Sequence, residues 1–406
     1  MILPRKHTPI ATSDRIVSLD IIRGFALFGI LLVNMPLFQT PKLIEDLYMI
    51  TPSMSSTDSF LRMLLDVFVE AKFFTIFSFL FGISFYIFIK RAEEKQDNFY
   101  LLYSRRLIGL ALFGLLHLVF LWYGDILLQY ALSGFLLIYF YNKENKTILK
   151  WLGVFTFALL ALLSLSILGS ASSVKQPNTS LQEIGSRKVQ EAIDVYQNGS
   201  YVEWISYRFF NEVIPVLMNL PFQLITSLFM FLIGLYVAKR GIFNNIPLHK
   251  PFIKRVCVIS FIVSIPISIA IIILHLKIVD FGVLNNEMIQ SLVMISGLSL
   301  SFFYVSTLVL LLEREKWRRI LSPLSYVGRM ALTNYILQTI IGVGVFTGLA
   351  MFGTLNIGLG IIISIIIFPL QILFSYLWLK RFRFGPLEWV WRSITYGKMQ
   401  PLKIVK

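Results

Sequence analysis

Long apolar runs recur along this chain, and they constrain its fold more than any other feature of the sequence. They lie at residues 24–38, 67–89, 107–123, 126–141, 148–168, 217–237, 256–274, 288–312, 331–351 and 357–379. A helix needs about 20 consecutive apolar residues to cross the hydrocarbon core of a bilayer. Since 56% of the residues are hydrophobic and only 15% are charged, the pattern predicts an all-α polytopic membrane helix bundle with about ten transmembrane helices.

Lysine and arginine are concentrated in every second connection between these runs. The basic connections lie at residues 90–106, 142–150, 239–255, 313–320 and 380–384. Cytoplasmic loops retain Lys and Arg, so both termini are expected in the cytoplasm. The net charge of +15 then belongs mainly to the inner face, where it suits anionic membrane lipid and does not indicate nucleic acid as a partner.

The chain is expected to form a single integral-membrane domain, 1–406, with an outer polar loop at 169–207 and an inner interfacial segment at 380–406. Apolar residues at helical spacing predict a short surface helix over 180–196 in the outer loop. Tryptophans among basic residues predict an amphipathic inner segment. One cysteine, Cys257, allows no intrachain disulfide, and scattered histidines give no metal site.

Polar side chains inside the apolar runs are costly in lipid and are therefore candidate functional residues. Asp20 and Arg23 lie three residues apart at the cytoplasmic entrance of the first run. They form either an ion pair that anchors the helix end or a binding site for an anionic ligand. Asn34 either bonds a neighbouring helix or contacts substrate, and Lys72 either extends toward the outer interface or contacts substrate.

His117 lies deep in the third run, and it is the strongest candidate for a residue that transfers protons. Imidazole is the side chain whose ordinary pKa suits proton transfer near neutrality. A simple hydrogen bond between helices is the alternative. Asp125 follows Gly124 in a tight reversal, where it either caps the next helix or acts with His117.

The ninth run carries a polar ladder. Asn334 and Gln338 are four residues apart on one helical face, and Arg329 precedes them toward the cytoplasm. Packing between helices is the alternative to substrate contact. Arg105 and Arg106 are expected at the same depth as the charged pair at the first entrance.

Five blocks in chain order resemble the YeiB-like membrane proteins, the domain of unknown function numbered 418. They read "RIVSLDIIRGFALFGILLVN", "KFFTIFSFLFG", "RRLIGLALFGLLHLVFLWYGDILLQYALSG", "VGRMALTNYILQ" and "FRFGPLEWVWRSITYGK". The resemblance covers residues 15–398 and implies a multi-pass protein of a bacterial plasma membrane. It implies little about chemistry.

The opening "R..SLD..RG", followed by "VN", is also similar to the start of transmembrane acyltransferases, including the lysosomal heparan-glucosaminide acetyltransferase and the acyltransferase-3 proteins. The matching positions are Arg15, Ser18, Leu19, Asp20, Arg23, Gly24 and Asn34. This resemblance implies a cytosolic acyl-CoA donor and an acceptor from the opposite side. The heparan enzyme has its catalytic histidine shortly after the Asn, whereas residues 35–56 here contain none. His117 would have to supply the base.

Two functions are therefore predicted as alternatives. In an acyltransferase, His117 and Asp125 are catalytic, the entrance charges hold the acyl-CoA, and Asn34 or Lys72 steadies the oxyanion. In a proton-coupled transporter or exporter of a small metabolite or lipid, His117 and Asp125 carry the proton. A non-enzymatic lipid-binding protein is a third hypothesis.

The expected partners are membrane lipid and a small-molecule or lipid substrate, without metal, and the sequence leaves a homodimer open. The predicted cofactor-binding residues are Asp20, Arg23, Arg105, Arg106 and Arg329, and the predicted substrate-binding residues are Asn34, Lys72, Asn334 and Gln338.

Overall fold

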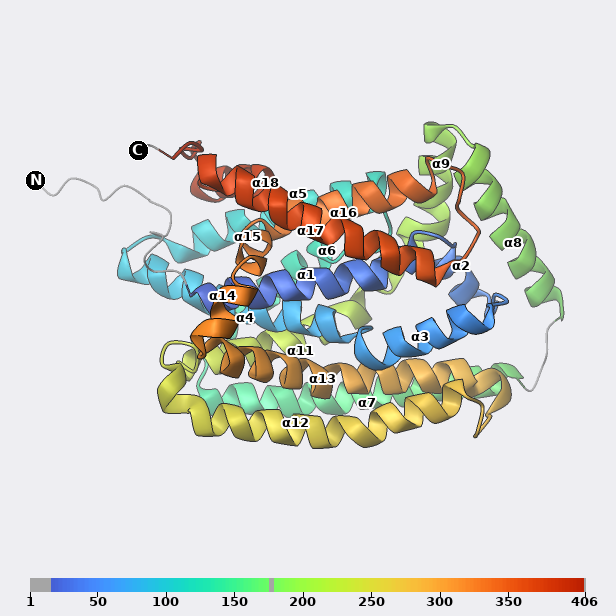
Figure 1. The fold of residues 1–406 in the computed structure, drawn as a ribbon, viewed down its shortest axis with the longest axis horizontal. Coiled ribbons are helices and arrows are strands. Elements are labelled where there is room, and N and C mark those ends of the chain that lie inside the picture. Colours follow the sequence, from blue (N-terminus) through green and yellow to red (C-terminus); the bar gives the residue numbers. More distant parts are fainter. Residues whose placement is uncertain (1–15, 175–178, 405–406) are drawn as a thin grey trace, which may run out of the picture.

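The structure is a computed structural model that describes residues 16–174 and 179–404. Arg15 of the opening motif lies outside the described residues. Within those two ranges the regular elements are helices, apart from an isolated bridge between Phe382 and Lys403. Most of the long helices run along the long axis of the molecule (Figure 1).

Eight of the described segments are long and apolar enough to cross a membrane. Their helices are α1 (Val17–Leu37), α3 and α4 together (Ser56–Phe68 and Lys72–Glu94), α5 (Phe99–Phe120), α7 (Asn145–Val174), α11 (Leu220–Lys239), α12 (Ile246–His275), α13 (Asn285–Leu312) and α17 (Ile357–Arg381). Two shorter apolar helices complete the bundle, α6 (Leu127–Ile138) and α16 (Ala331–Phe346). Each of the predicted apolar runs therefore coincides with one of these segments, and the chain is a polytopic helical membrane protein.

Short helices gather at the two ends of the bundle (Figure 1). At one end, here called the α8 end, lie α2 (Lys42–Leu47), α8 (Thr179–Asn198), α9 (Tyr201–Arg208), the π-helix η2 (Phe209–Val213), α10 (Ile214–Met218) and the 3₁₀ turn η3 (Gly282–Leu284). Toward the other end, here called the α18 end, lie α14 (Glu315–Leu321), α15 (Leu324–Arg329) and α18 (Pro386–Tyr396). The surface helix predicted over 180–196 is confirmed as α8.

The second apolar run does not form one continuous helix, which corrects the predicted span at 67–89. The helix stops at Phe68 and restarts at Lys72. Between them, Ala71 adopts a left-handed backbone conformation with φ of 63°, which a non-glycine residue rarely takes. Hydropathy gave no sign of this break because apolar residues continue on both sides of it.

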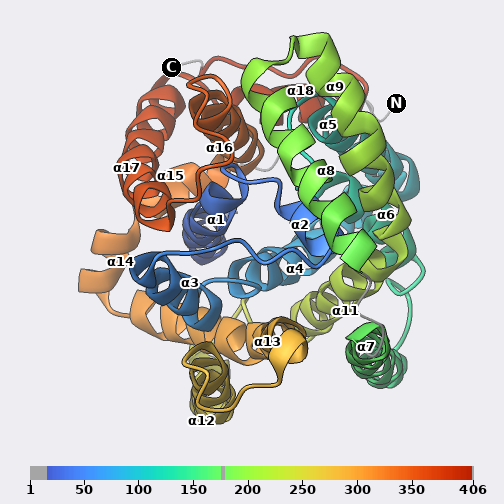
Figure 2. The same cartoon turned by 90° about the vertical axis from the view of Figure 1, so that its right-hand side faces the viewer.

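Helix α1 lies near the middle of the bundle, whereas α7 and α12 lie at its edge (Figure 2). Helix α1 packs against α4, α15, α16 and α17. The approach to α15 is so close that a Cβ on Gly328 would lie 1.9 Å from the carbonyl oxygen of Asp20, and one on Gly24 would lie 2.1 Å from that of Leu324. Small residues allow such close contact between membrane helices.

Candidate functional site

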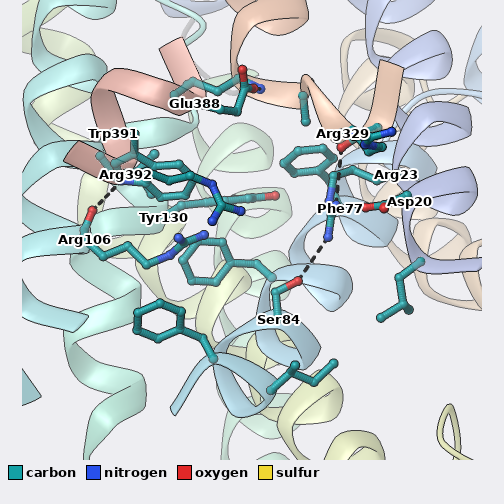
Figure 3. Close-up of a pocket in the computed structure, with 18 of the residues that line it drawn as sticks. Asp20, Arg23, Phe77, Ser84, Arg106, Tyr130, Arg329, Glu388, Trp391 and Arg392 are labelled. Carbon is teal, nitrogen blue, oxygen red and sulfur yellow. Dashed lines mark hydrogen bonds and ion pairs between the residues drawn. The ribbon is translucent and has the colours of Figure 1, made fainter. Parts of the chain in front are cut away.

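A cavity of ≈ 230 Å³ lies toward the α18 end, between α1, α4, α5, α6, α15, α16 and α18. Guanidinium groups dominate its polar lining. The arginines concerned are Arg23, Arg91, Arg106, Arg329 and Arg392. They come from five different helices or helix ends, so folding collects positive charge that is dispersed in the sequence (Figure 3).

Arg23 occupies one wall, where its orientation is fixed by three acceptors. One Nη atom lies 2.8 Å from a carboxylate oxygen of Asp20 and 3.3 Å from the carbonyl oxygen of Gly328. The other donates to the hydroxyl of Ser84 at 3.2 Å. The predicted ion pair is therefore present, and both of its residues also line the cavity. Anchoring the helix and facing a ligand are compatible roles here.

Arg106 and Arg392 lie across the cavity from Arg23 (Figure 3). The guanidinium carbon of Arg106 is 3.8 Å from the ring centre of Trp391 and 5.1 Å from that of Phe88. The indole N–H of Trp391 donates to the carbonyl oxygen of Arg106 at 2.7 Å. Aromatic faces hold a planar cation in this way by cation–π attraction. Arg106 is consequently preorganised beside an aromatic surface.

The second carboxylate of the lining, Glu388 on α18, is bonded to the start of α16. Its oxygens accept hydrogen bonds from the backbone N–H groups of Leu332 at 2.7 Å and Thr333 at 3.0 Å, and from the Thr333 hydroxyl at 2.6 Å. Burial raises the pKa of Glu388, and the bonds from Thr333 and Leu332 act in the opposite direction. Among the described residues, five arginines and two carboxylates line the cavity, a composition that suits an anionic ligand.

Apolar and aromatic side chains form the rest of the lining. Examples are Phe77, Phe81, Leu110 and Leu127. The cavity thus combines a cationic part with a large apolar part, which is the character expected for a ligand that carries both anionic and apolar groups.

His117 and Asp125 are brought together beside this cavity. The Nδ1 atom of His117 lies 3.0 Å from Oδ1 of Asp125, and its Nε2 atom lies 2.9 Å from the hydroxyl of Thr339 on α16. The other Asp125 oxygen accepts a hydrogen bond from the backbone N–H of Leu128 at 2.7 Å. Asp125 therefore both caps the start of α6 and faces His117, so the two alternatives for this residue coexist.

A tyrosine ring separates this pair from the cavity. Tyr335 lines the cavity, its ring centre lies 5.1 Å from that of His117, and its hydroxyl donates to the carbonyl oxygen of Gly124 at 2.9 Å. As far as the described residues define the lining, His117 and Asp125 are not part of it. His117 is 1% exposed.

The polar ladder of α16 faces neighbouring helices. The amide of Asn334 donates to the hydroxyl of Ser375 at 2.9 Å, and that of Gln338 donates to the amide oxygen of Gln371 at 2.9 Å. These bonds join α16 to α17, as the packing alternative requires.

Three other predicted residues lie apart from the described lining. Asn34 is half-buried near the end of α1. Arg105 is exposed, and its guanidinium lies over Gly397. Lys72 belongs to a separate charged network. Of the predicted ligand-binding residues, the cavity therefore gathers Asp20, Arg23, Arg106 and Arg329.

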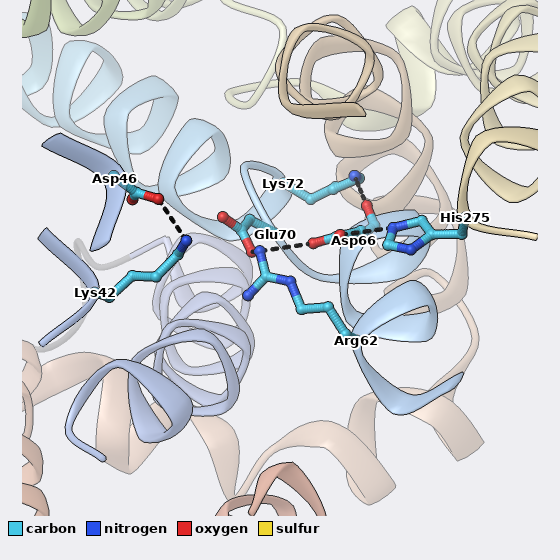
Figure 4. A network of polar contacts seen from close by, with 7 residues as sticks. All are labelled: Lys42, Asp46, Arg62, Asp66, Glu70, Lys72 and His275. Atoms are coloured by element: carbon cyan, nitrogen blue, oxygen red, sulfur yellow. Dashed lines mark hydrogen bonds and ion pairs between the residues drawn. The ribbon is translucent and has the colours of Figure 1, made fainter. Parts of the chain in front are cut away.

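The network around Lys72 occupies the break between α3 and α4 (Figure 4). The ammonium group of Lys72 donates to the backbone oxygen of Asp66 at 2.6 Å. The guanidinium of Arg62 lies 2.9 Å from the Asp66 carboxylate and 2.5 Å from that of Glu70. His275, at the end of α12, lies 2.9 Å from the other Asp66 oxygen. Mutual pairing keeps these charges out of lipid.

Buried polar contacts close the α8 end of helix α5. The guanidinium of Arg208 lies 2.8 Å from Glu212 and donates to the backbone oxygen of Leu118 at 3.0 Å. The hydroxyl of Tyr196 donates to the other Glu212 oxygen at 2.5 Å. Arg208 is 0% exposed, so the helices of the α8 end are held firmly against the residues that follow His117.

Sequence reasoning missed several cavity residues. Arg91 lies in a connection whose basic character predicted only orientation, Arg392 and Glu388 lie in the predicted inner amphipathic segment, and none of the three was predicted as a site residue. Thr339 gave no signal, because a threonine in an apolar helix is common. Only the spatial approach of α5 and α16 shows its contact with His117.

The fold and the cavity define the class: a multi-pass helical membrane protein with an arginine-lined, partly aromatic cavity in the bundle. The model of the DUF418 family, proteins of unknown function, matches residues 237–398. The chain is 33% identical to the uncharacterised protein YxaH of Bacillus subtilis, over 97% of each chain. It belongs to the DUF418 family, which confirms the resemblance to YeiB-like proteins.

Two further relatives support this membership. An uncharacterised protein encoded in the amylase 3′ region of Bacillus acidopullulyticus is 33% identical over 98% of this chain and 99% of its own. The uncharacterised protein YeiB of Escherichia coli is 27% identical over 96% and 98%. No solved structure matches the chain.

Proposed function

We propose that this protein is an integral-membrane acyltransferase that passes an acyl group from a cytosolic acyl-CoA-type donor to a hydroxyl or amine acceptor reached from the outer side. The observation that carries the proposal is the position of His117 next to the arginine-lined cavity. The arginine-lined cavity extends to Tyr335 and Ile126, and the His117–Asp125 pair lies directly behind that tyrosine ring.

The cavity offers a matching partner for each part of such a donor. Arg23 and Arg106, on opposite walls, would hold phosphate groups, since guanidinium groups bind phosphate oxygens in pairs of hydrogen bonds. The ring of Trp391 would support the base. The apolar residues further in would take the pantetheine arm and direct the thioester toward Tyr335.

In the transfer step His117 acts as the general base. Nε2 takes the proton of the hydroxyl or amine whose oxygen or nitrogen attacks the thioester carbonyl carbon. The C–S bond breaks, and the sulfur leaves with that proton as the free thiol. Asp125 keeps the proton of the neutral ring on Nδ1 and stabilises the imidazolium. This step requires the Tyr335 ring to move aside.

The proposed orientation places the α18 end, with both termini, in the cytoplasm of a bacterial plasma membrane. The basic connections at 90–106 and 380–384 support it through the tendency of cytoplasmic loops to retain Lys and Arg. All ten apolar segments then cross the bilayer, and the arginine cavity faces the compartment that contains acyl-CoA.

A proton-coupled transporter or exporter is the second candidate, and the complete burial of His117 favours it. A cavity at one end, with a titratable pair behind it and the Arg208 contacts closing the other end, has the arrangement of one state of an alternating-access cycle. Such a protein would move its ligand without breaking a covalent bond.

Two measurements separate these functions. Purified protein in lipid nanodiscs is titrated with acetyl-CoA, and free CoA release is then followed with a panel of sugars, amines and lipid acceptors. We expect binding and acceptor-dependent release. His117→Ala should retain binding and lose about 100- to 10,000-fold in turnover, the contribution of one general base. If wild-type protein fails to bind acetyl-CoA at millimolar concentration, the proposal is wrong, and ligand counterflow in proteoliposomes would favour the transporter.

A further inference from the structure

Besides Asp125 and the ring of Tyr335, His117 contacts Thr339, which the proposed function does not use. Its Nε2 atom lies 2.9 Å from the hydroxyl oxygen of Thr339, and its Nδ1 atom lies 3.0 Å from Oδ1 of Asp125. Hydroxyl, imidazole and carboxylate therefore lie in the order of a nucleophile, a base and an acidic group, although the short His117–Asp125 contact lacks the angle of a hydrogen bond.

The tautomer follows from these contacts. The Asp125 carboxylate oxygen lies 3.0 Å from Nδ1, and its negative charge favours the proton of the neutral imidazole on that nitrogen, which leaves Nε2 as an acceptor. The hydroxyl proton of Thr339 has two acceptors in reach, Nε2 at 2.9 Å and the backbone oxygen of Tyr335 at 3.4 Å. Nε2 is the nearer of the two acceptors and the stronger base, so the hydroxyl is aligned for deprotonation.

The contact between Nε2 and Thr339 also keeps an acceptor molecule from reaching this nitrogen. Nε2 is the only ring nitrogen free to take a proton, and Thr339 already occupies it. Both residues are 1% exposed. Thr339 also lies one helical turn, about 6 Å, beyond Tyr335 on the same face of α16. An acyl group that passes the Tyr335 ring therefore comes to the face of α16 that carries this hydroxyl.

We infer that Thr339 is the nucleophile of a covalent, two-step transfer; this inference rests on the proposed acyltransferase function. In the first step the Thr339 oxygen attacks the thioester carbonyl carbon while its proton passes to His117 Nε2. The C–S bond breaks, and the sulfur takes that proton, giving free CoA and an acyl-threonine ester. In the second step the acceptor attacks the ester, its proton passes through Nε2 to the departing Thr339 oxygen, and the hydroxyl is restored.

The test is isotope exchange in the absence of acceptor, because it detects the first step even when the ester does not accumulate. Purified protein is mixed with acetyl-CoA and radiolabelled CoA, and transfer of label into acetyl-CoA is measured. Wild-type protein should catalyse exchange. Thr339→Val, which keeps the shape of the side chain but removes the hydroxyl, should lose at least about 100-fold, and Thr339→Ser should restore it. Mass spectrometry of acid-quenched protein should place an acetyl group on Thr339.

The possible outcomes distinguish failure of the covalent step from failure of the proposed acyltransferase function. Acceptor-dependent turnover without exchange, or turnover retained in Thr339→Val, would show direct transfer and overturn the covalent step while the acyltransferase stands. Failure of wild-type protein to bind or use acetyl-CoA would overturn both. Acetyl-CoA binding by Thr339→Val serves as the folding control, since loss of binding would assign Thr339 a structural role.

Discussion

At the scale of single residues, two adjacent arginines illustrate how a helix assigns opposite environments to neighbours. Arg105 and Arg106 have the same chemistry and the same depth along α5, but consecutive residues point about 100° apart around a helix. Arg106 lines the cavity against Trp391, whereas Arg105 is exposed. The sequence predicted both as donor-binding residues and had no means of choosing between them.

This pair provides a matched test of the cavity. Arg106→Gln should weaken acetyl-CoA binding by about 10-fold or more, since a hydrogen bond to a charged group contributes about 1.5–3 kcal/mol. Arg105→Gln removes the same charge one residue away and should leave the dissociation constant within about 2-fold. Calorimetric titration of both variants in nanodiscs gives the comparison. Equal losses would indicate a general effect of surface charge and would argue against the cavity as the donor site.

At the scale of helices, close backbone contact holds the cavity walls in position. Asp20 and Arg23 lie on α1, and Gly328 and Arg329 lie on α15, so the contact at Gly328 brings two parts of the lining together. An apolar pattern predicts that a helix is buried, but it does not reveal which neighbour it touches. A glycine in the first apolar run and another just before the ninth were the available signal, but nothing in the sequence indicates that these two glycines lie at the same contact.

We expect Gly328→Ala to separate these helices. Its Cβ would lie 1.9 Å from the backbone oxygen of Asp20, and relief of such overpacking costs about 1–3 kcal/mol. The variant should melt earlier in detergent and bind acetyl-CoA more weakly. Gly153→Ala on α7 is the control, because nothing lies within 4 Å of its Cβ position. A Gly328→Ala protein that melts and binds like wild type would contradict the tight contact.

The break between α3 and α4 shows where helix prediction from hydropathy stops. Asp66, Glu70 and Lys72 lie at this break. Their actual partners include Arg62 on α3 and His275 at the distant end of α12. A pairing between residues more than 200 positions apart arises only from tertiary folding.

At the scale of the whole molecule, the proposed orientation can be tested directly. In a Cys257→Ser background, Ser186→Cys lies on exposed α8 and Asn142→Cys in the exposed connection between α6 and α7. Because these positions belong to opposite ends of the bundle, an impermeant maleimide applied to intact spheroplasts should label only Ser186→Cys. Both should react after permeabilisation. Labelling of Asn142→Cys in intact spheroplasts would reverse the orientation or change the number of crossings.

The sequence by itself determined that this protein is a helical bundle in a membrane, where its apolar segments lie, and that its family is DUF418. It could do so because burial in lipid constrains the composition of each segment separately. It also selected Asp20, Arg23 and His117, since polar groups inside apolar runs are costly enough to stand out.

Only the tertiary structure decided which of these residues lie together. It collected five arginines from different helices around one cavity, placed Tyr335 between that cavity and His117, and brought the Thr339 hydroxyl to the ring. Asn334 and Gln338, equally polar in the sequence, were turned toward α17. The physical reason is that hydropathy is a property of each residue, whereas a site depends on distances between side chains from separate helices, and those distances are set by how the helices pack.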